Sequence, residues 1–160
     1  LESGQSANFV NYTSYDKGIN GIMIDIANLA GMPNASDFIF KVGNNNNPAE
    51  WTNALNASQI VTRDIGDGKT RITLIWVDNA IKNTWLQVTV KAGGDIGLLS
   101  DKVFYFGNAT ADCGNRTGNA MVNAIDMLSG RVNPTLSATI INAYDYNRDK
   151  KVDSNDVTAA

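Results

Sequence analysis

Residues 60–76 have the sequence IVTRDIGDGKTRITLIW, which predicts a β-hairpin. Ile60–Asp64 and Thr70–Trp76 are the expected strands, and Gly66-Asp67-Gly68 lies between them. An Asp-Gly pair supplies the positive φ angles that a tight primed turn needs. We therefore expect two antiparallel strands joined at this turn.

The segments on both sides of this hairpin also have the two-residue period of strands with one buried face. Apolar side chains recur at every second position in residues 22–26, 38–42 and 85–90. Phe104 and Phe106 are expected to close the core in a final strand. About seven or eight short strands without helical periodicity favour a mainly β chain, with an antiparallel β-sandwich over residues 1–106. The inward positions are Ile22, Ile24, Ile26, Phe38, Phe40, Val42, Leu86, Val88 and Val90.

We expect the strands at 71–76 and 85–90 to pair, and this pairing predicts which tryptophans are buried and which point outward. In that register the apolar residues of both strands lie on one face of the sheet. Trp76 is then mostly in the core, and Trp85 points outward among hydrogen-bonding residues. Trp51 lies in a polar stretch, so we expect it in a loop.

An outward tryptophan beside polar residues is typical of a sugar-binding site. The flat ring stacks on the C–H face of a pyranose, while neighbouring polar groups bond its hydroxyls. The alternative is that Trp51 or Trp85 packs beneath a loop or against the C-terminal part of the chain. The candidate sugar-binding residues are Trp85, Trp51, Trp76, Gln87 and Thr73.

Residues 145–156, DYNRDKKVDSND, have oxygen-bearing side chains at positions one, three, five, nine and twelve of a calcium-binding loop. Position six is Lys150 instead of glycine, so a non-glycine residue must adopt left-handed backbone angles. Val152, at position eight, is expected to pair this loop with a second one. The alternative is a polar surface turn that is rich in Asp and Asn. The candidate ligands are Asp145, Asn147, Asp149, the Lys151 carbonyl, Asp153 and Asp156.

Residues 112–126 end with the same pattern of an apolar residue, an Asn or Asp, and a final Asp. The first Asp lies too far upstream for a standard loop. Either this loop contains an insertion and still closes on calcium, or it has degenerated. Helices are expected after the two loops, at Ala124–Gly130 and Val157–Ala160. The candidate ligands are Asp112, Asn115, Asn119, Asn123 and Asp126, most of them neutral amides, which predicts weaker binding than in the second loop.

With this paired pattern, residues 107–160 resemble a dockerin, the calcium-binding loop-helix module of secreted bacterial polysaccharide-degrading systems. Residues 1–106 resemble a carbohydrate-binding module of a cellulase in their strand pattern and aromatic content. The resemblance implies a secreted, calcium-binding, non-catalytic part of a bacterial glycoside hydrolase that holds the enzyme on plant β-glucan, such as cellulose or xyloglucan. One alternative is that the dockerin-like part docks a cohesin-like protein or only clasps the sandwich. Another is a structural or adhesive domain of a surface protein.

The composition excludes several kinds of catalysis, metal site and binding partner. The chain has no histidine, which removes Ser-His-Asp and Cys-His catalysis and His-ligated zinc. Its single cysteine, Cys113, cannot form an internal disulfide. A net charge of −3 without a cluster of Lys or Arg argues against nucleic acid or an anionic membrane as a partner. The first residues, Leu-Glu-Ser-Gly, and the short final helix suggest a piece of a longer protein.

The chain has carboxylates that could form a glycosidase pair, but their spacing in the sequence does not identify any two of them as catalytic. Most lie in turns, where Asp is expected for backbone reasons. We therefore expect that the chain is not an enzyme. The carboxylates considered are Asp25, Asp37, Glu50, Asp64, Asp78 and Asp95.

Overall fold

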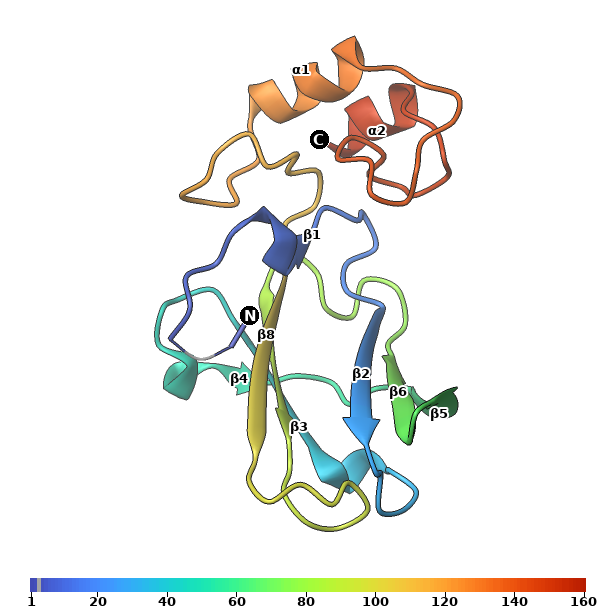
Figure 1. The fold of residues 1–160 in the computed structure, drawn as a ribbon. Helices are drawn as coiled ribbons and strands as arrows, with labels where there is room; N and C mark the ends of the chain where they lie inside the picture. The colour runs from blue at the N-terminus through green and yellow to red at the C-terminus, as the bar shows by residue number, and fades with distance from the viewer. Residues whose placement is uncertain (3) are drawn as a thin grey trace.

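The computed structural model describes residues 1–2 and 4–160. Within them the chain is mainly β, with two sheets and two α-helices (Figure 1). Sheet A has the strand order β1-β8-β7-β3-β4, and sheet B has the order β2-β6-β5. The strands are β1 (Tyr12–Thr13), β2 (Gly21–Ala27), β3 (Phe38–Gly43), β4 (Thr52–Asn53), β5 (Gln59–Gly66), β6 (Lys69–Ile75), β7 (Trp85–Val90) and β8 (Lys102–Asn108). The helices are α1 (Ala124–Val132) and α2 (Ser154–Ala159), with single 3-10 turns η1 (Phe9–Asn11), η2 (Ala35–Asp37) and η3 (Pro48–Glu50).

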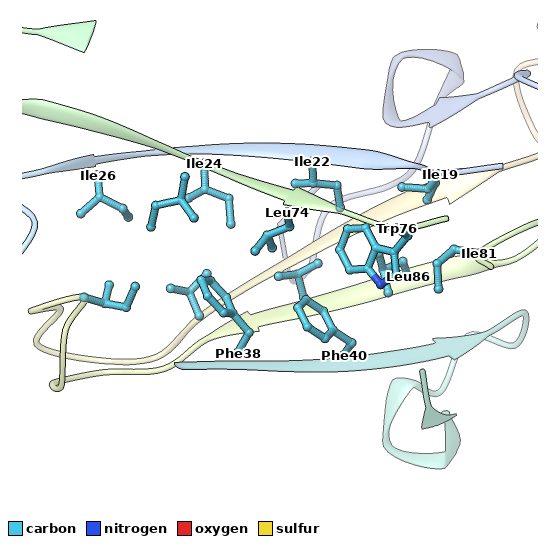
Figure 2. Close-up of a cluster of buried hydrophobic side chains, with 14 residues drawn as sticks. Ile19, Ile22, Ile24, Ile26, Phe38, Phe40, Leu74, Trp76, Ile81 and Leu86 are labelled. Atoms are coloured by element: carbon cyan, nitrogen blue, oxygen red, sulfur yellow. The ribbon is translucent and has the colours of Figure 1, made fainter. Parts of the chain in front are cut away.

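The inner faces of the two sheets bury one shared hydrophobic core. Ile22, Ile24 and Ile26 of β2 are buried, while the residues between them are exposed. Figure 2 shows these side chains facing Phe38 and Phe40 of β3 across the core. A strand that alternates in this way buries one face, and two such sheets exclude water when they pack together. The arrangement is compatible with the expected β-sandwich.

The hairpin predicted from the sequence is confirmed. Gly66 pairs with Lys69, which leaves Asp67 and Gly68 as the two-residue turn between β5 and β6. Asp67 has a φ of 53° and Gly68 a φ of 67°, as a type I′ turn requires. The register shifts between Asp64 and Gly66, which is a β-bulge next to the turn.

The expected pairing of β6 with β7 is wrong. β6 lies between β2 and β5 in sheet B, whereas β7 lies between β8 and β3 in sheet A. The apolar residues of the two strands therefore meet across the core instead of sharing one face of a sheet. Alternation predicts which face of a strand is buried, but facing strands of two sheets satisfy it as well as neighbouring strands do.

The sequence predicted antiparallel strands throughout, but β1 and β8 of sheet A are parallel. Tyr12 of β1 is in register with Gly107 of β8, and Thr13 with Asn108. β8 therefore runs past the expected boundary at residue 106. β1 lies at the end of the two-sheet unit from which the chain continues toward the helices (Figure 1).

The helices α1 and α2 pack together beyond that end of the sheets (Figure 1). Each begins with a reciprocal cap, formed by Asn123 and Asp126 in α1 and by Asp153 and Asp156 in α2. Because Asp153 caps it, α2 begins at Ser154, earlier than expected. Among residues 1–2 and 4–160, neither helix combines the length and the hydropathy that a membrane crossing requires.

Candidate functional site

A cleft of about 720 Å³ lies on the outer face of sheet A. Trp85 of β7 and Tyr105 of β8 form its floor, and Trp51 borders it from the turn before β4. Its walls come from the N-terminal residues, the asparagine-rich loop at 44–48, and two residues of the C-terminal segment, Thr117 and Gly118. The cleft therefore joins parts of the chain that are far apart in the sequence.

Two glycines make room for the tryptophan rings. Trp85 is in register with Gly43 on one neighbouring strand and with Gly107 on the other. A Cβ atom on Gly43 would collide with the Trp51 ring, and one on Gly107 would lie 3.2 Å from the Trp85 ring. Each ring therefore lies over a strand position that has no side chain, as in the aromatic covering of glycines in other sheets.

Trp51 is 9% exposed, so most of its ring is buried. Its Nε1–H donates to the carbonyl oxygen and to Oδ1 of Asn45, both at 3.0 Å. The ring meets Tyr105 edge to face, with centroids 5.8 Å apart. Glu50 accepts hydrogen bonds from the amides of Asn45 and Asn47 and so holds the loop over the ring. Trp51 therefore packs beneath a loop, as the alternative interpretation of the sequence had it, and gives the cleft only a narrow part of its ring.

Trp85 is half-buried and borders the cleft directly. Gln87, on the same face of β7, donates from Nε2 to the Tyr105 hydroxyl at 3.0 Å. Sequence reasoning missed Tyr105. The signal was present, because Tyr105 alternates with the inward-facing Phe104 and Phe106 and must therefore point outward.

Trp76, Thr73 and Gln87 are not among the residues that line this cleft, which corrects the expected set. Trp76 is 3% exposed and lies in the core, where its Nε1–H donates to the Leu55 carbonyl at 3.0 Å. Thr73 is half-buried on the outer face of β6, in sheet B. Because β6 and β7 belong to different sheets, Thr73 cannot stand beside Trp85.

The second loop wraps around two buried carboxylates, Asp145 and Asp156. Asp156 accepts from the backbone N–H of Tyr146 at 2.6 Å and of Asp153 at 2.9 Å. Asp145 accepts from the backbone N–H of Lys150 at 3.1 Å through Oδ2. Lys150 has a φ of 73°, which confirms the left-handed conformation predicted for position six. Asn147 and Asp149 accept the backbone N–H groups of Asp149 and Lys151 within the same loop.

A cation fits this loop because one carboxylate oxygen has no other partner. Asp145 is 2% exposed, and its Oδ1 makes no hydrogen bond. Burial raises the pKa of Asp145, so its negative charge is disfavoured without compensation. Within residues 1–2 and 4–160, no three His, Cys, Asp or Glu side chains are gathered as a metal site. The remaining ligands would be oxygens of the kind that calcium takes readily, the Asn147 amide and the Lys151 carbonyl.

The first loop has the same hydrogen-bonded frame as the second. The N–H of Cys113 donates to Asp126 Oδ1 at 3.0 Å, as that of Tyr146 does to Asp156. The N–H of Asn123 donates to Asp126 Oδ2 at 2.9 Å, as that of Asp153 does to Asp156. The two loops therefore correspond, and the first contains additional residues between its two aspartates.

In the first loop, groups of the protein itself satisfy the carboxylates. Asp126 also accepts from Asn115 Nδ2 at 3.0 Å, and Asp112 accepts from the N–H of Gly114 at 2.7 Å. The Tyr12 phenol lies beside Asp112, and burial together with this carboxylate raises the pKa of Tyr12. Asn119 is exposed and accepts only from the N–H of Met121. A cation in this loop would have to displace these donors.

Calorimetric titration with calcium is therefore expected to show two unequal sites, or one site only. The second loop should be the tighter one, because a cation there meets a buried oxygen that nothing else satisfies. Asp145→Asn should remove the tight site and leave any weak one. Two tight sites of equal affinity would contradict this prediction.

Val152 does not pair the two loops, which corrects another expectation. Its N–H donates to the Thr135 carbonyl at 2.8 Å, and Thr135 donates back at 3.2 Å. The partner therefore comes from the segment after α1 and not from the first loop. Val152 is nonetheless buried, at 1% exposure, so its apolar character serves packing.

Comparison with protein-family models, with curated proteins and with solved structures gives no match for this chain. The function therefore has to be inferred from the cleft and the two loops.

Proposed function

We propose that the chain is a non-catalytic carbohydrate-binding module of a secreted bacterial glycoside hydrolase. In this role it holds an attached enzyme on plant β-glucan, such as cellulose or xyloglucan. The observation that supports it best is the cleft on sheet A, in which Trp85 and Tyr105 lie beside asparagine amides. An aromatic floor with a few converging polar groups is the usual composition of a ligand site.

The chemistry of the cleft suits a neutral sugar. Its rings offer apolar faces for the C–H groups of a pyranose, and the amides of Gln5 and Asn46 can bond hydroxyls. Among the described residues that line it, Glu2 is the only one with a charged side chain. An anionic ligand would leave water without finding a Lys or Arg side chain in the cleft, which is costly. A neutral glucan avoids that cost.

Calcium has a structural role in this proposal. Bound in the second loop, it would neutralise the gathered carboxylates and so favour the folded state by mass action. The C-terminal segment is then a dockerin-like pair of loops, of which the first binds weakly or not at all. The residues that would hold the ion are Asp145, Asn147, Asp149, Lys151, Asp153 and Asp156.

The test is isothermal titration of the Trp85→Ala variant with cello-oligosaccharides and xyloglucan fragments. Losing one stacking ring is expected to weaken the binding free energy by on the order of 1–3 kcal/mol, as when an aromatic residue at the centre of a protein interface is truncated. That is about a five- to hundred-fold loss of affinity. Thermal melts should show that the variant stays folded, since Trp85 is only half-buried.

Thr73→Ala is the matched control, because it changes the outer face of sheet B and should leave sugar affinity unchanged. Trp51→Ala should lower both affinity and stability, since its ring is mostly buried. Should Trp85→Ala and Trp51→Ala both fold and bind as tightly as the wild type, the proposed cleft is wrong.

A second candidate function is docking to a cohesin-like β-sandwich protein. The observation that favours it is an apolar stripe on α1, where Ile125, Leu128 and Val132 are between 50% and 63% exposed. Their spacing puts them on one face of the helix, and at least half of each residue is open to solvent. Binding of a cohesin, together with failure to bind any polysaccharide, would give this function first place.

A further inference from the structure

The C-terminal segment forms part of the sugar cleft. Thr117 and Gly118 of the first loop line it together with Trp85. A Cβ atom on Gly114 of the same loop would lie 2.6 Å from the Phe9 ring, so the loop rests closely on η1. The wall on this side therefore depends on how the first loop sits on the N-terminal segment.

Tyr12 of β1 contacts both the first loop and the cleft floor. Its ring meets Trp85 at 6.4 Å and Phe9 at 5.4 Å, in both cases edge to face. Its phenol lies beside the buried carboxylate of Asp112. A shift of β1 would therefore move a neighbour of the Trp85 ring and a partner of the first loop at once.

The second loop holds the residues that follow β1. The carbonyl of Tyr146 accepts from the N–H of Asp16 at 2.8 Å. Arg148 donates from Nη2 to Oγ of Ser14 at 3.2 Å, and Ser14 is only 1% exposed. Tyr146 also links the two loops, because its hydroxyl donates to the Asp126 carbonyl at 3.3 Å.

Two features of the second loop would be stabilised by a bound cation. Arg148 and Lys150 have φ angles of 58° and 73°, a strained region for residues other than glycine. The unpartnered Oδ1 of Asp145 lies in the same loop. Without a cation, charge repulsion and backbone strain both favour a looser loop, which would release Tyr146 and Arg148 from the segment that follows β1.

We propose that the cation loop and the sugar cleft are coupled, so that calcium in the second loop raises the affinity of the cleft for glucan. The link runs from Tyr146 and Arg148 to residues 14–16, and from there through Tyr12 to Trp85. This inference rests on the proposed function. Coupling of this kind is reciprocal, so the sugar must raise calcium affinity by the same factor.

The experiment is calorimetric titration with cellohexaose, in saturating calcium and in excess chelator. Sugar affinity should be higher with calcium by about five-fold or more, the lower end of usual coupling. Calcium titrations with and without cellohexaose should give the same factor. Ser14→Ala removes the acceptor of Arg148 Nη2 without touching a cation ligand. It should reduce the coupling factor while both ligands still bind. Ser36→Ala, an exposed serine outside both sites, is the control.

Tryptophan emission gives a readout that needs no sugar. Calcium alone should change the emission of the wild type, and Trp85→Phe should lose most of that change. If both ligands bind but neither alters the affinity for the other, the coupling is wrong and the proposed function stands. If cellohexaose binds under no condition, the proposed function fails, and the coupling fails with it.

Discussion

In excess chelator the protein should melt about 5–10 °C lower than in calcium, and Asp145→Ala should abolish this difference. Free calcium at 100 times its dissociation constant stabilises the folded state by about 2.7 kcal/mol. For a chain of this size, each kcal/mol is worth roughly 2–4 °C. The calcium effect should be lost in the variant because the side chain with the unpartnered buried oxygen is gone.

The measurement is a thermal melt followed by circular dichroism, with and without chelator. Asp78→Ala removes an exposed carboxylate outside both loops and should keep the full calcium effect. A wild-type melting curve that does not move when excess chelator is added would rule out calcium as a stabilising ligand.

Trp76→Ala should destabilise the protein by about 3–5 kcal/mol, the usual cost of truncating a buried aromatic residue. The ring is 3% exposed and meets Phe40 edge to face at 5.1 Å. Its loss also leaves the Leu55 carbonyl without the donor that Nε1 provides. Urea denaturation monitored by circular dichroism would give the free energy of unfolding.

Trp85→Ala is the comparison for that experiment, because it removes the same ring from a half-buried position on the outer face. Its stability loss should be clearly smaller, while its effect on sugar binding should be larger. Equal midpoints of denaturation for Trp76→Ala and the wild type would show that Trp76 does not support the core.

Local features were predictable from the sequence because local chemistry determines them. The two-residue alternation identified the buried face of β2, and Asp67-Gly68 identified the turn between β5 and β6. The spacing of oxygens in the second loop placed Lys150 at the position with left-handed angles, as observed. In each case the relevant partners lie within a few residues of one another.

Features that depend on distant partners were not predictable in this way. The local sequence of β6 does not indicate that its neighbours are β2 and β5, or that β7 lies across the core. The same holds for Tyr12, which comes from near the start of the chain and lies beside Asp112 of the first loop. For a related reason, the polar sequence around Trp51 did not indicate that its ring is mostly buried. The polar residues before it in the sequence fold back over its ring and accept the hydrogen bond of its Nε1–H.

The hydrogen bond between Arg148 and Ser14 spans 134 residues. During synthesis Ser14 can therefore gain this partner only after a further 134 residues have been made. The hairpin of β5 and β6 has no such delay, because its two strands are adjacent in the sequence. A ribosome-bound chain that stops before the second loop would thus contain the strands of both sheets, while Ser14 and Asp16 still lack their hydrogen bonds to that loop. In newly made protein these hydrogen bonds from the second loop would therefore form only after the strands of both sheets are present.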